Sequence, residues 1–250
     1  MIDLLLIGIG TGNPDHLTLQ AIKALNSADL VLIPRKGEAK ADLAELRRAI
    51  CADVLTNSAV RIVDFDLPVR DAANRDYLAG VEDWHDAIAT VWAGAIAANI
   101  GTTGRVALLV WGDPSLYDST LRIAARLGAV QPTTVTIIPG ITSLQALTAA
   151  HAIPINDIGA PFTVTTGRKL REEGWPESAD TLAIMLDGEC SFQTIDPAGI
   201  SIWWGAYVGM AEQVILSGPL ETTAAKIIAA RAEARAKHGW IMDIYILRRG

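Results

Sequence analysis

The sequence predicts an α/β protein of two α/β/α domains, the first with a mostly parallel sheet and the second with a mixed sheet. In the first half of the chain, short apolar runs alternate with helical patterns, which is typical of parallel sheets covered on both faces. In the second half, strand-like runs outnumber helices, which indicates antiparallel pairs. Half of the 250 residues are apolar, enough to bury a sizeable core. We expect one domain at residues 1–118 and the other at residues 119–250.

The first domain is expected to begin with a strand at residues 4–9, a continuous apolar run that a glycine-rich turn separates from a helix. A second apolar run is expected to stop at Pro34, which has no amide hydrogen to donate. Leu43, Leu46 and Ile50 recur at helical spacing and mark one apolar face. The further elements expected in this half are helices at 18–26, 41–50 and 76–99 and strands at 30–33, 60–63 and 106–110.

The second half of the chain is richer in strands than the first. Short runs of β-branched and apolar residues are separated by few helical patterns. The expected helices are 142–150 and 222–237, and the expected strands are 135–138, 162–165, 182–185, 202–204, 213–216 and 242–247.

Composition narrows the classes of function. The 21 basic and 28 acidic residues give a net charge of −7, which argues against a general binder of nucleic acid or membrane surfaces. Cys51 and Cys190 form no disulfide framework or zinc spacing, and the histidines form no metal-binding motif. The apolar run near the N-terminus stops at Gly8, and no stretch reaches the roughly 18–20 apolar residues that span a membrane. We therefore expect a cytoplasmic protein without a metal, and without nucleic-acid or membrane partners.

The first motif is GIGTGNP at residues 8–14, between an expected strand and an expected helix. It does not fit a dinucleotide-binding fingerprint, because Asn13 stands where the third glycine is needed and Pro14 breaks the tight turn into the helix. The second strand ends in Pro34 and Arg35, so no acid stands at its end to bind a ribose. A dehydrogenase is therefore disfavoured. What remains is either a plain tight turn or glycines that let the backbone approach a ligand.

Two further motifs follow expected strands. The segment WGDPSLY at residues 111–117 lies at the carboxyl end of a buried strand, where open α/β sheets bind ligands. The segment IPGITS at residues 138–143 places Thr142 and Ser143 at the start of a helix, whose amides can face a ligand. Taken singly, the first is also compatible with an ordinary type I turn and the second with simple helix capping.

Taken together, the order and spacing of these motifs resemble the tetrapyrrole methylase family, and the resemblance runs from Leu4 to Leu247. It implies a two-domain fold of the class III methyltransferase type, with S-adenosyl-L-methionine bound in a cleft between the domains and converted to S-adenosyl-L-homocysteine. It also implies a small-molecule tetrapyrrole substrate and a homodimer.

The resemblance further implies which residues bind the cofactor. Thr11 stands where relatives carry a proline, and residues 187–201 are a short segment where relatives often fit a full helix. The cofactor contacts that the resemblance implies are Thr11, Trp111, Gly112, Asp113, Leu116, Thr142, Ser143, Leu186, Ala206, Tyr207 and Met242.

Three segments narrow the resemblance within the family. VLIPRKG at 31–37, VWGDPSLYDST at 110–120 and VTTGRKL at 164–170 are most similar to the enzyme that methylates carbon 1 of precorrin-5 and releases the extruded acetyl group as acetate, in aerobic cobalamin biosynthesis. The alternatives are another precorrin or uroporphyrinogen C-methyltransferase, a relative acting on a modified histidine of a protein or on ribosomal RNA, and a cofactor-binding sensor without catalysis. The acidic composition weighs against RNA.

The chemistry of such a reaction assigns further roles. Methyl transfer from a sulfonium needs mainly alignment of the two reactants, whereas acetyl release needs a base for water. Asp113 and Tyr117 are the catalytic candidates, and Asp15 and His16 are alternatives for the base. Because the substrate carries several carboxylates, cations that follow strands are expected to bind it. These expected substrate-binding residues are Arg35, Lys36 and Arg168.

Overall fold

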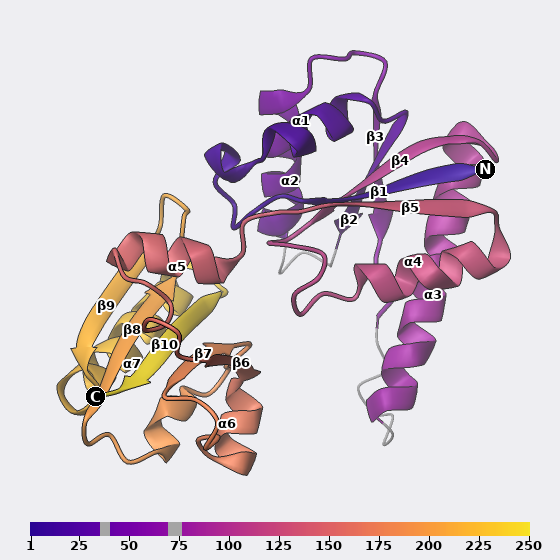
Figure 1. Ribbon diagram of the computed structural model, residues 1–250. Helices are drawn as coiled ribbons and strands as arrows, with labels where there is room; N and C mark the ends of the chain where they lie inside the picture. Colours follow the sequence, from indigo (N-terminus) through magenta and orange to yellow (C-terminus); the bar gives the residue numbers. More distant parts are fainter. Residues whose placement is uncertain (36–40, 70–76) are drawn as a thin grey trace. The chain divides into compact units, whose positions relative to one another are not determined.

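The computed structural model describes residues 1–35, 41–69 and 77–250 of the chain (Figure 1). The chain divides into two compact units, Met1–Ile141 and Thr142–Gly250. Each unit is described by itself below.

The first unit is built on a five-stranded sheet in the order β3-β2-β4-β1-β5, in which every paired strand is parallel. The prediction of a mostly parallel first sheet is therefore confirmed. The strands are β1 (Ile2–Gly8), β2 (Leu30–Arg35), β3 (Arg61–Asp66), β4 (Gly104–Val110) and β5 (Thr133–Ile138).

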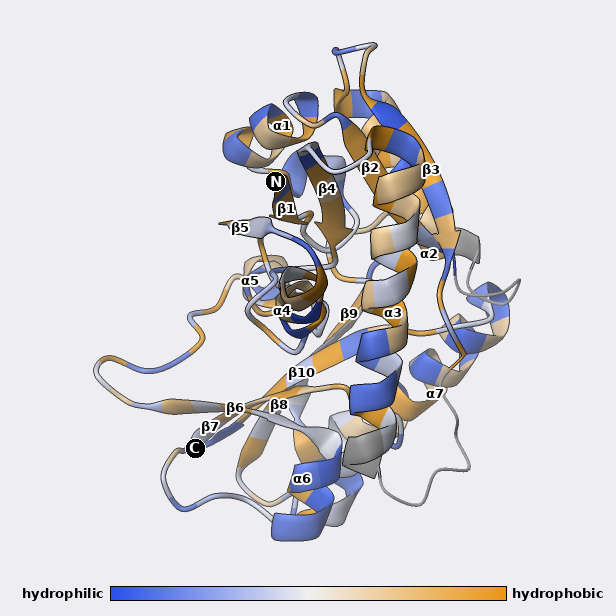
Figure 2. Ribbon diagram, turned by 90° about the vertical axis from the view of Figure 1, so that its right-hand side faces the viewer, coloured by the Kyte–Doolittle hydropathy of each residue, from blue (hydrophilic) through white to orange (hydrophobic). Residues whose placement is uncertain are grey.

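Helices cover both faces of this sheet. On β1, Leu4 and Leu6 belong to the core cluster that includes Trp92, while Leu5 and Ile7 belong to the opposite cluster. One face packs against α3 (Tyr77–Ile100) and α4 (Thr120–Val130), and the other against α1 (Leu19–Asn26) and α2 (Ala41–Val54). Figure 2 shows the central strands β2 and β4 in hydrophobic colours, as expected of strands buried on both faces.

Pro34 does not end the second strand, contrary to our expectation. β2 continues to Arg35 by pairing with β3, whereas its pairing with β4 stops at Leu32. Pro34 thus lies beyond the ladder between β2 and β4, so its missing amide costs that ladder no hydrogen bond.

The division between the units falls later than the expected boundary at residues 118 and 119. The reason is that β5 pairs with β1 from Ile2 to Ile7 and so completes the first sheet. The strand expected at residues 135–138 therefore belongs to the first unit, together with α4, whose Ile123 and Leu127 pack into the first core.

The second unit contains a five-stranded sheet in the order β6-β7-β10-β8-β9. Only β6 and β7 pair in parallel, while the other three pairs are antiparallel, which confirms the prediction of a mixed sheet. The strands are β6 (Phe162–Thr166), β7 (Thr181–Met185), β8 (Ile200–Ala206), β9 (Val214–Pro219) and β10 (Asp243–Arg249).

The second core lies mainly on one face of this sheet. There Trp204 and Tyr245 pack among residues of α6 (Gly167–Glu173), the 3-10 turn η3 (Ser191–Thr194) and α7 (Leu220–His238). On the other face lies α5 (Ser143–His151), whose Leu147 reaches Gly205 of β8. Helix α6 was not expected from the sequence, and it begins where the Thr166 hydroxyl accepts a hydrogen bond from the Lys169 amide at 3.3 Å.

Candidate functional site

Three glycines bring the carboxyl ends of β1, β4 and β5 into direct backbone contact. A Cβ atom on Gly140 would lie 2.1 Å from the Gly112 carbonyl oxygen and 2.8 Å from the Gly8 Cα. A Cβ on Gly8 would lie 2.6 Å from the Gly140 amide nitrogen. No side chain fits at Gly8 or Gly140, so the loops can meet only as bare backbone. We call this region, with its loops at residues 8–17, 110–118 and 138–141, the first edge.

A short antiparallel bridge joins two of these loops. The Gly112 amide donates to the Gly10 carbonyl at 2.8 Å, and the Gly10 amide donates to the Gly112 carbonyl at 3.3 Å. Both glycines adopt positive φ angles, 75° at Gly10 and 65° at Gly112. The bridge lies between the neighbouring strands β1 and β4. From β1 the chain crosses to β2 on one side of this pair, and from β4 it crosses to β5 on the other side. Ligands bind at such switch points in open α/β sheets.

The Asp113 carboxylate joins the loop after β4 to the loop after β5. One carboxylate oxygen accepts the Gly140 amide at 2.8 Å, and the other accepts the Ser115 amide at 2.8 Å and the Ser115 hydroxyl at 2.5 Å. Burial raises the pKa of Asp113, but the hydrogen bonds from Ser115 and Gly140 outweigh it and hold the pKa below its ordinary value. An ionised carboxylate with these donors is a weak base. The geometry therefore favours Asp113 as a support of the loop.

Leu116 and Tyr117 complete the loop that follows β4. The Leu116 amide donates to the Asp113 carbonyl at 3.3 Å, which closes the turn. Tyr117 has a φ angle of 49°, and 45% of the residue is exposed. A positive φ is uncommon for an aromatic residue, and such outliers gather at functional sites. Trp111, the remaining loop residue that the sequence singled out, is half-buried against the α1 and α2 side of the sheet.

Thr11 and His16 form a pair on the loop after β1. The Thr11 hydroxyl lies 3.3 Å from Nδ1 of His16. Thr11 is buried, and His16 is half-buried at the end of the 3-10 turn η1 (Pro14–His16). A Cβ on Gly10 would lie 2.9 Å from the His16 Cβ, so His16 packs against the glycine that bridges to Gly112.

Arg35 and Arg47 both lie near the first edge. Arg35 ends β2 and forms an exposed ion pair with Asp66 at 3.0 Å, while Lys36 lies outside the described residues. Arg47 of α2 was not foreseen from the sequence. Its Nε donates to the Leu109 carbonyl at 3.0 Å, and burial lowers its pKa. Arg47 follows Leu43 by four residues, which places it on the apolar face of α2. A basic residue at such a position is the sequence signal that could have identified it.

In the second unit, the sheet topology gathers four predicted residues at one edge. β7 and β8 both run antiparallel to β10, so the ends of β7 and β8 lie beside the start of β10. Leu186 follows β7, Ala206 ends β8, Tyr207 follows Ala206, and Met242 precedes β10. The Tyr207 amide donates to the Met242 carbonyl at 2.9 Å. We call this region, with residues 166–171, 186–191, 206–207 and 242–243, the second edge.

The residues of the second edge differ in what they present. Leu186 has a φ angle of 53° and is 67% exposed, so a strained backbone presents an apolar side chain. Ala206 and Tyr207 are buried, and the Tyr207 hydroxyl donates to the Trp240 carbonyl at 2.5 Å. These two can therefore offer a ligand their backbone more readily than their side chains. Arg168 is exposed on α6, directly after β6.

Thr142 and Ser143 begin α5. The Thr142 hydroxyl accepts the Leu144 amide at 3.2 Å, and the Gln145 side-chain oxygen accepts the Thr142 amide at 3.1 Å. This reciprocal pair is a capping box, so it explains the helix start. Because the Thr142 side chain is used in capping, it is the Ser143 side chain and the helix amides that this end of α5 could present to a ligand.

A buried network centred on Asp187 was not foreseen from the sequence. One oxygen of its carboxylate accepts the Tyr245 hydroxyl at 2.6 Å and the Ser191 amide at 2.5 Å. The other lies 3.2 Å from Arg171 and accepts the Ser191 hydroxyl at 2.7 Å. A Cβ on Gly167 would lie 2.3 Å from the Asp187 carboxyl carbon, so only glycine fits beside it. Asp187 directly follows Leu186 and anchors the backbone that carries it.

A second buried ion pair flanks this network. Nε of Arg231 lies 2.9 Å from Asp243, whose carboxylate also accepts the Trp204 indole N–H at 3.0 Å. Arg231 further donates to the Asp187 carbonyl at 3.2 Å, which links the two clusters. Burial raises the pKa of Asp243 despite these donors.

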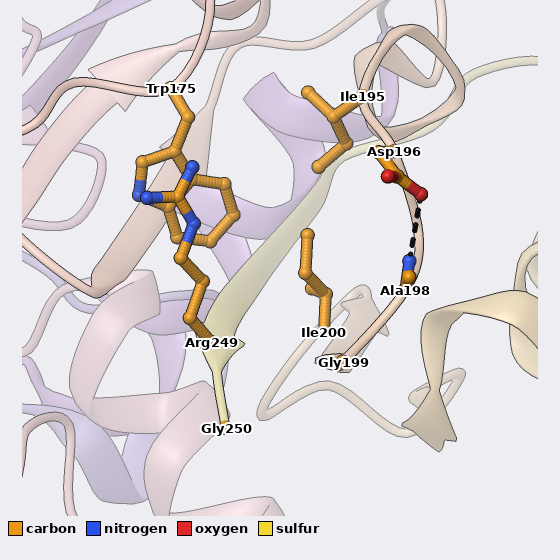
Figure 3. A pocket seen from close by; sticks show the side chains of 8 residues that line it. All are labelled: Trp175, Ile195, Asp196, Ala198, Gly199, Ile200, Arg249 and Gly250. Carbon is orange, nitrogen blue, oxygen red and sulfur yellow. Dashed lines mark hydrogen bonds between the residues drawn. The ribbon is translucent and has the colours of Figure 1, made fainter.

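One pocket lies away from both edges. Its volume is about 310 Å³, and the Arg249 guanidinium stacks over the Trp175 ring with 4.4 Å between them (Figure 3). It lies where β8 begins and β10 ends. Leu186 lies at the other end of these strands. It contains none of the predicted site residues. Its lining residues are Trp175, Ile195, Asp196, Ala198, Gly199, Ile200, Arg249 and Gly250.

Within residues 1–35, 41–69 and 77–250, no three metal-ligating side chains come together. In the same part of the chain, every helix is too short or too polar to cross a bilayer.

Comparison with known proteins assigns the chain to a family. The sequence model of the tetrapyrrole (corrin/porphyrin) methylases matches residues 3–224. The chain is 49% identical over 249 residues to the Sinorhizobium protein named precorrin-6A synthase [deacetylating], covering 99% of this chain and 95% of that protein. It is 31% identical, over 72% of this chain and 71% of the other, to a Sinorhizobium precorrin-2 C(20)-methyltransferase.

Solved structures show the same fold. A cobalamin synthesis related protein (CobF) from Corynebacterium diphtheriae superposes with a TM-score of 0.85 at 37% identity, covering 100% of this chain and 99% of that one. A Thermus thermophilus uroporphyrin-III C-methyl transferase complexed with S-adenyl homocysteine superposes with a TM-score of 0.59 at 18% identity, covering 98% and 97%, which shows the fold alone. With a family match across residues 3–224 and a relative 49% identical over almost its whole length, the chain belongs to the tetrapyrrole methylase family.

Proposed function

We propose that this chain methylates carbon 1 of precorrin-5 with S-adenosyl-L-methionine and releases the extruded acetyl group as acetate, giving precorrin-6A in aerobic cobalamin biosynthesis. The observation that carries the proposal is the 49% identity, over 99% of the chain, to a protein named precorrin-6A synthase [deacetylating]. The relative named for carbon 20 of precorrin-2 is only 31% identical over 72% of the chain. The reaction on carbon 1 is therefore better supported than one on another ring carbon.

The first edge suits the cofactor in one specific respect. Gly8, Gly112 and Gly140 hold three loops together with no side chains between them, and Gly112 adopts a positive φ angle. Bare backbone of this kind lets a ligand approach amides and carbonyls closely. S-adenosyl-L-methionine supplies a methyl group on a positively charged sulfur. The residues proposed to hold it in this unit are Thr11, Trp111, Gly112, Asp113 and Leu116.

The second unit contributes further proposed cofactor contacts, namely Thr142, Ser143, Leu186, Ala206, Tyr207 and Met242. Support comes from the topology, which brings the last four to one edge of one sheet. The role of all these residues is to bind and orient. Holding two reactants in line lowers a barrier by about 7–11 kcal/mol, so methyl transfer needs no nucleophile from the protein.

The substrate carboxylates are proposed to meet cations. Arg35 is half exposed, and its partner Asp66 is 77% exposed, so the pair is weak and Arg35 can exchange its partner for a substrate carboxylate. Arg168 is exposed directly after β6. Lys36 completes the proposed set. We also propose a cytoplasmic homodimer, on the family resemblance.

The test is direct. The purified protein is incubated with S-adenosyl-L-methionine and enzymatically generated precorrin-5, and the products are followed by mass spectrometry together with an acetate assay. Formation of precorrin-6A and acetate supports the proposal. Methylation of precorrin-2 or uroporphyrinogen III without acetate points to another family reaction. Cofactor binding without turnover of any of these tetrapyrroles indicates a sensor.

A further inference from the structure

The proposed reaction includes a hydrolytic step that needs a base, and the inference below rests on that proposed function. Water must lose a proton as it attacks the acetyl carbonyl, and a positioned base contributes about 10²- to 10⁴-fold to such a step. Asp113 is poorly suited, because Gly140 and Ser115 engage both carboxylate oxygens and its pKa is lowered.

His16 lies on the same edge and is held in place by two contacts. Its ring nitrogen Nδ1 is 3.3 Å from the Thr11 hydroxyl. Its Cβ packs where a side chain on Gly10 would stand, and Gly10 is bridged to Gly112. The backbone is fixed as well, since the His16 amide donates to the Asn13 carbonyl at 2.9 Å. The imidazole is thereby tied, through one glycine, to the loop proposed to hold the cofactor.

The contact with Thr11 is compatible with the tautomer that a general base needs. When Nδ1 carries the proton and donates it to the Thr11 oxygen, Nε2 keeps its lone pair and can accept a proton. Imidazole is the side chain that most often acts as a general base in enzymes.

We infer that His16, held by Thr11, is the general base that activates water for release of the acetyl group. Nε2 takes one proton from water while the water oxygen forms a bond to the acetyl carbonyl carbon. The carbon–carbon bond between the acetyl group and the ring then breaks, and its electron pair passes to the conjugated ring, where it cancels the positive charge left by methyl transfer. The proton on Nε2 passes to solvent. The acetic acid formed loses its own proton to solvent and leaves as acetate.

The experiment compares wild type, His16→Gln and His16→Ala, with His151→Gln as a matched control. His151 bonds the Trp204 carbonyl within the second unit, and a glutamine amide can keep that contact. Acetate release from precorrin-5 is measured as a function of pH, and S-adenosyl-L-methionine affinity is measured by calorimetry. We expect both His16 variants to release acetate about 10²- to 10⁴-fold more slowly with unchanged cofactor affinity. Wild type is expected to release acetate more slowly at acidic pH, and this fall should be absent from His16→Gln. Added imidazole should partly restore acetate release by His16→Ala.

Several outcomes contradict the inference. If His16→Gln releases acetate within a few-fold of wild type, or keeps the acidic limb of the pH profile, His16 is not the base. A slow His16→Ala that imidazole does not restore, with weakened cofactor binding, makes His16 structural and overturns the inference. If wild type itself releases no acetate, the proposed function fails and the role of His16 fails with it. If wild type releases acetate but the His16 variants behave as in the first two outcomes, only the role of His16 is contradicted.

Discussion

The first edge is shaped by glycine backbone, whereas the second edge is shaped by buried ionised side chains. At the first edge, Gly8 and Gly140 leave no room for a Cβ, and the Asp113 carboxylate accepts donors that are at most 27 residues away in sequence. At the second edge, Asp187 and Asp243 collect hydrogen bonds from arginine, tyrosine and tryptophan side chains of other elements. The two edges should therefore fail in different ways when a single residue is changed.

The difference has an energetic meaning. A glycine contact is sensitive to added volume, because packed backbone cannot move aside cheaply. A buried ion network is sensitive to removal of a partner, because the remaining charges stay desolvated without compensation. At the second edge this network also borders Leu186, whose positive φ needs surroundings that hold it in place.

Removal of the Asp187 carboxylate is expected to have the largest effect. Asp187→Ala leaves Arg171 and the Tyr245 hydroxyl without their buried partner and should lower the free energy of unfolding by about 3–5 kcal/mol. Urea unfolding followed by circular dichroism measures this. The control is Glu173→Ala, which breaks an exposed ion pair with Lys169 and should cost less than about 1 kcal/mol. Equal effects of the two substitutions would show that the network contributes no more than a surface pair.

The same network predicts a pH dependence. Burial raises the pKa of Asp187, but hydrogen bonds from Tyr245, Ser191 and Glu189 outweigh burial and lower the pKa overall. The folded protein thus keeps this carboxylate ionised at pH values where the unfolded chain binds a proton. Its contribution to stability is full above about pH 3.9 and is lost as the pH falls through the folded pKa. Stability measured between pH 6 and pH 3 should therefore fall less steeply in Asp187→Asn than in wild type.

A smaller effect is expected at the first edge. Gly140→Ala would place a Cβ 2.1 Å from the Gly112 carbonyl oxygen, so the loops must separate, at a cost of about 1–3 kcal/mol in stability. S-adenosyl-L-methionine affinity, measured by calorimetry, should fall as well. The control is Gly128→Ala, in the exposed part of α4 with no atom within 4 Å of the new Cβ. It should stabilise the protein by about 0.5–1 kcal/mol. An undiminished affinity in Gly140→Ala would remove the first edge from the proposed cofactor site.

The same difference explains what could be predicted from the sequence. The first edge was readable because GIGTG, WGDP and IPG each follow an apolar strand, and the carboxyl ends of parallel strands meet at one edge. The sheet types were readable from the ratio of strands to helices. The predicted domain boundary came too early because β5 pairs with β1, and nothing local in residues 133–138 encodes that distant partner.

The second edge was only partly readable. Leu186, Ala206 and Tyr207 were placed by family resemblance, but the network beneath them was not foreseen. Asp187 and Tyr245 are 58 residues apart, and Arg231 is 44 residues from the Asp187 carbonyl that it binds. No periodicity connects such residues, and a buried aspartate looks the same in sequence as a solvated one. The positive φ of Leu186 is likewise invisible, because leucine rarely adopts it.

The smallest expected change in stability, at Leu186, separates strain from function. A left-handed conformation costs a residue with a side chain roughly 1–2 kcal/mol, and glycine avoids most of this cost while making the unfolded chain more flexible. Because the Leu186 residue is 67% exposed, Leu186→Gly loses little burial and should raise the free energy of unfolding by no more than about 1 kcal/mol. If the side chain contacts the cofactor, the variant should lose about 1 kcal/mol of binding free energy, a rise of roughly fivefold in Kd.

Ala152→Gly is the control, since Ala152 is exposed at the end of α5 with a φ angle of 52°. It should show the gain in stability without the loss of affinity. A Leu186→Gly variant that is strongly destabilised would mean that Leu186 is held for packing, and one with unchanged Kd would mean that the strained residue at the second edge does not touch the cofactor.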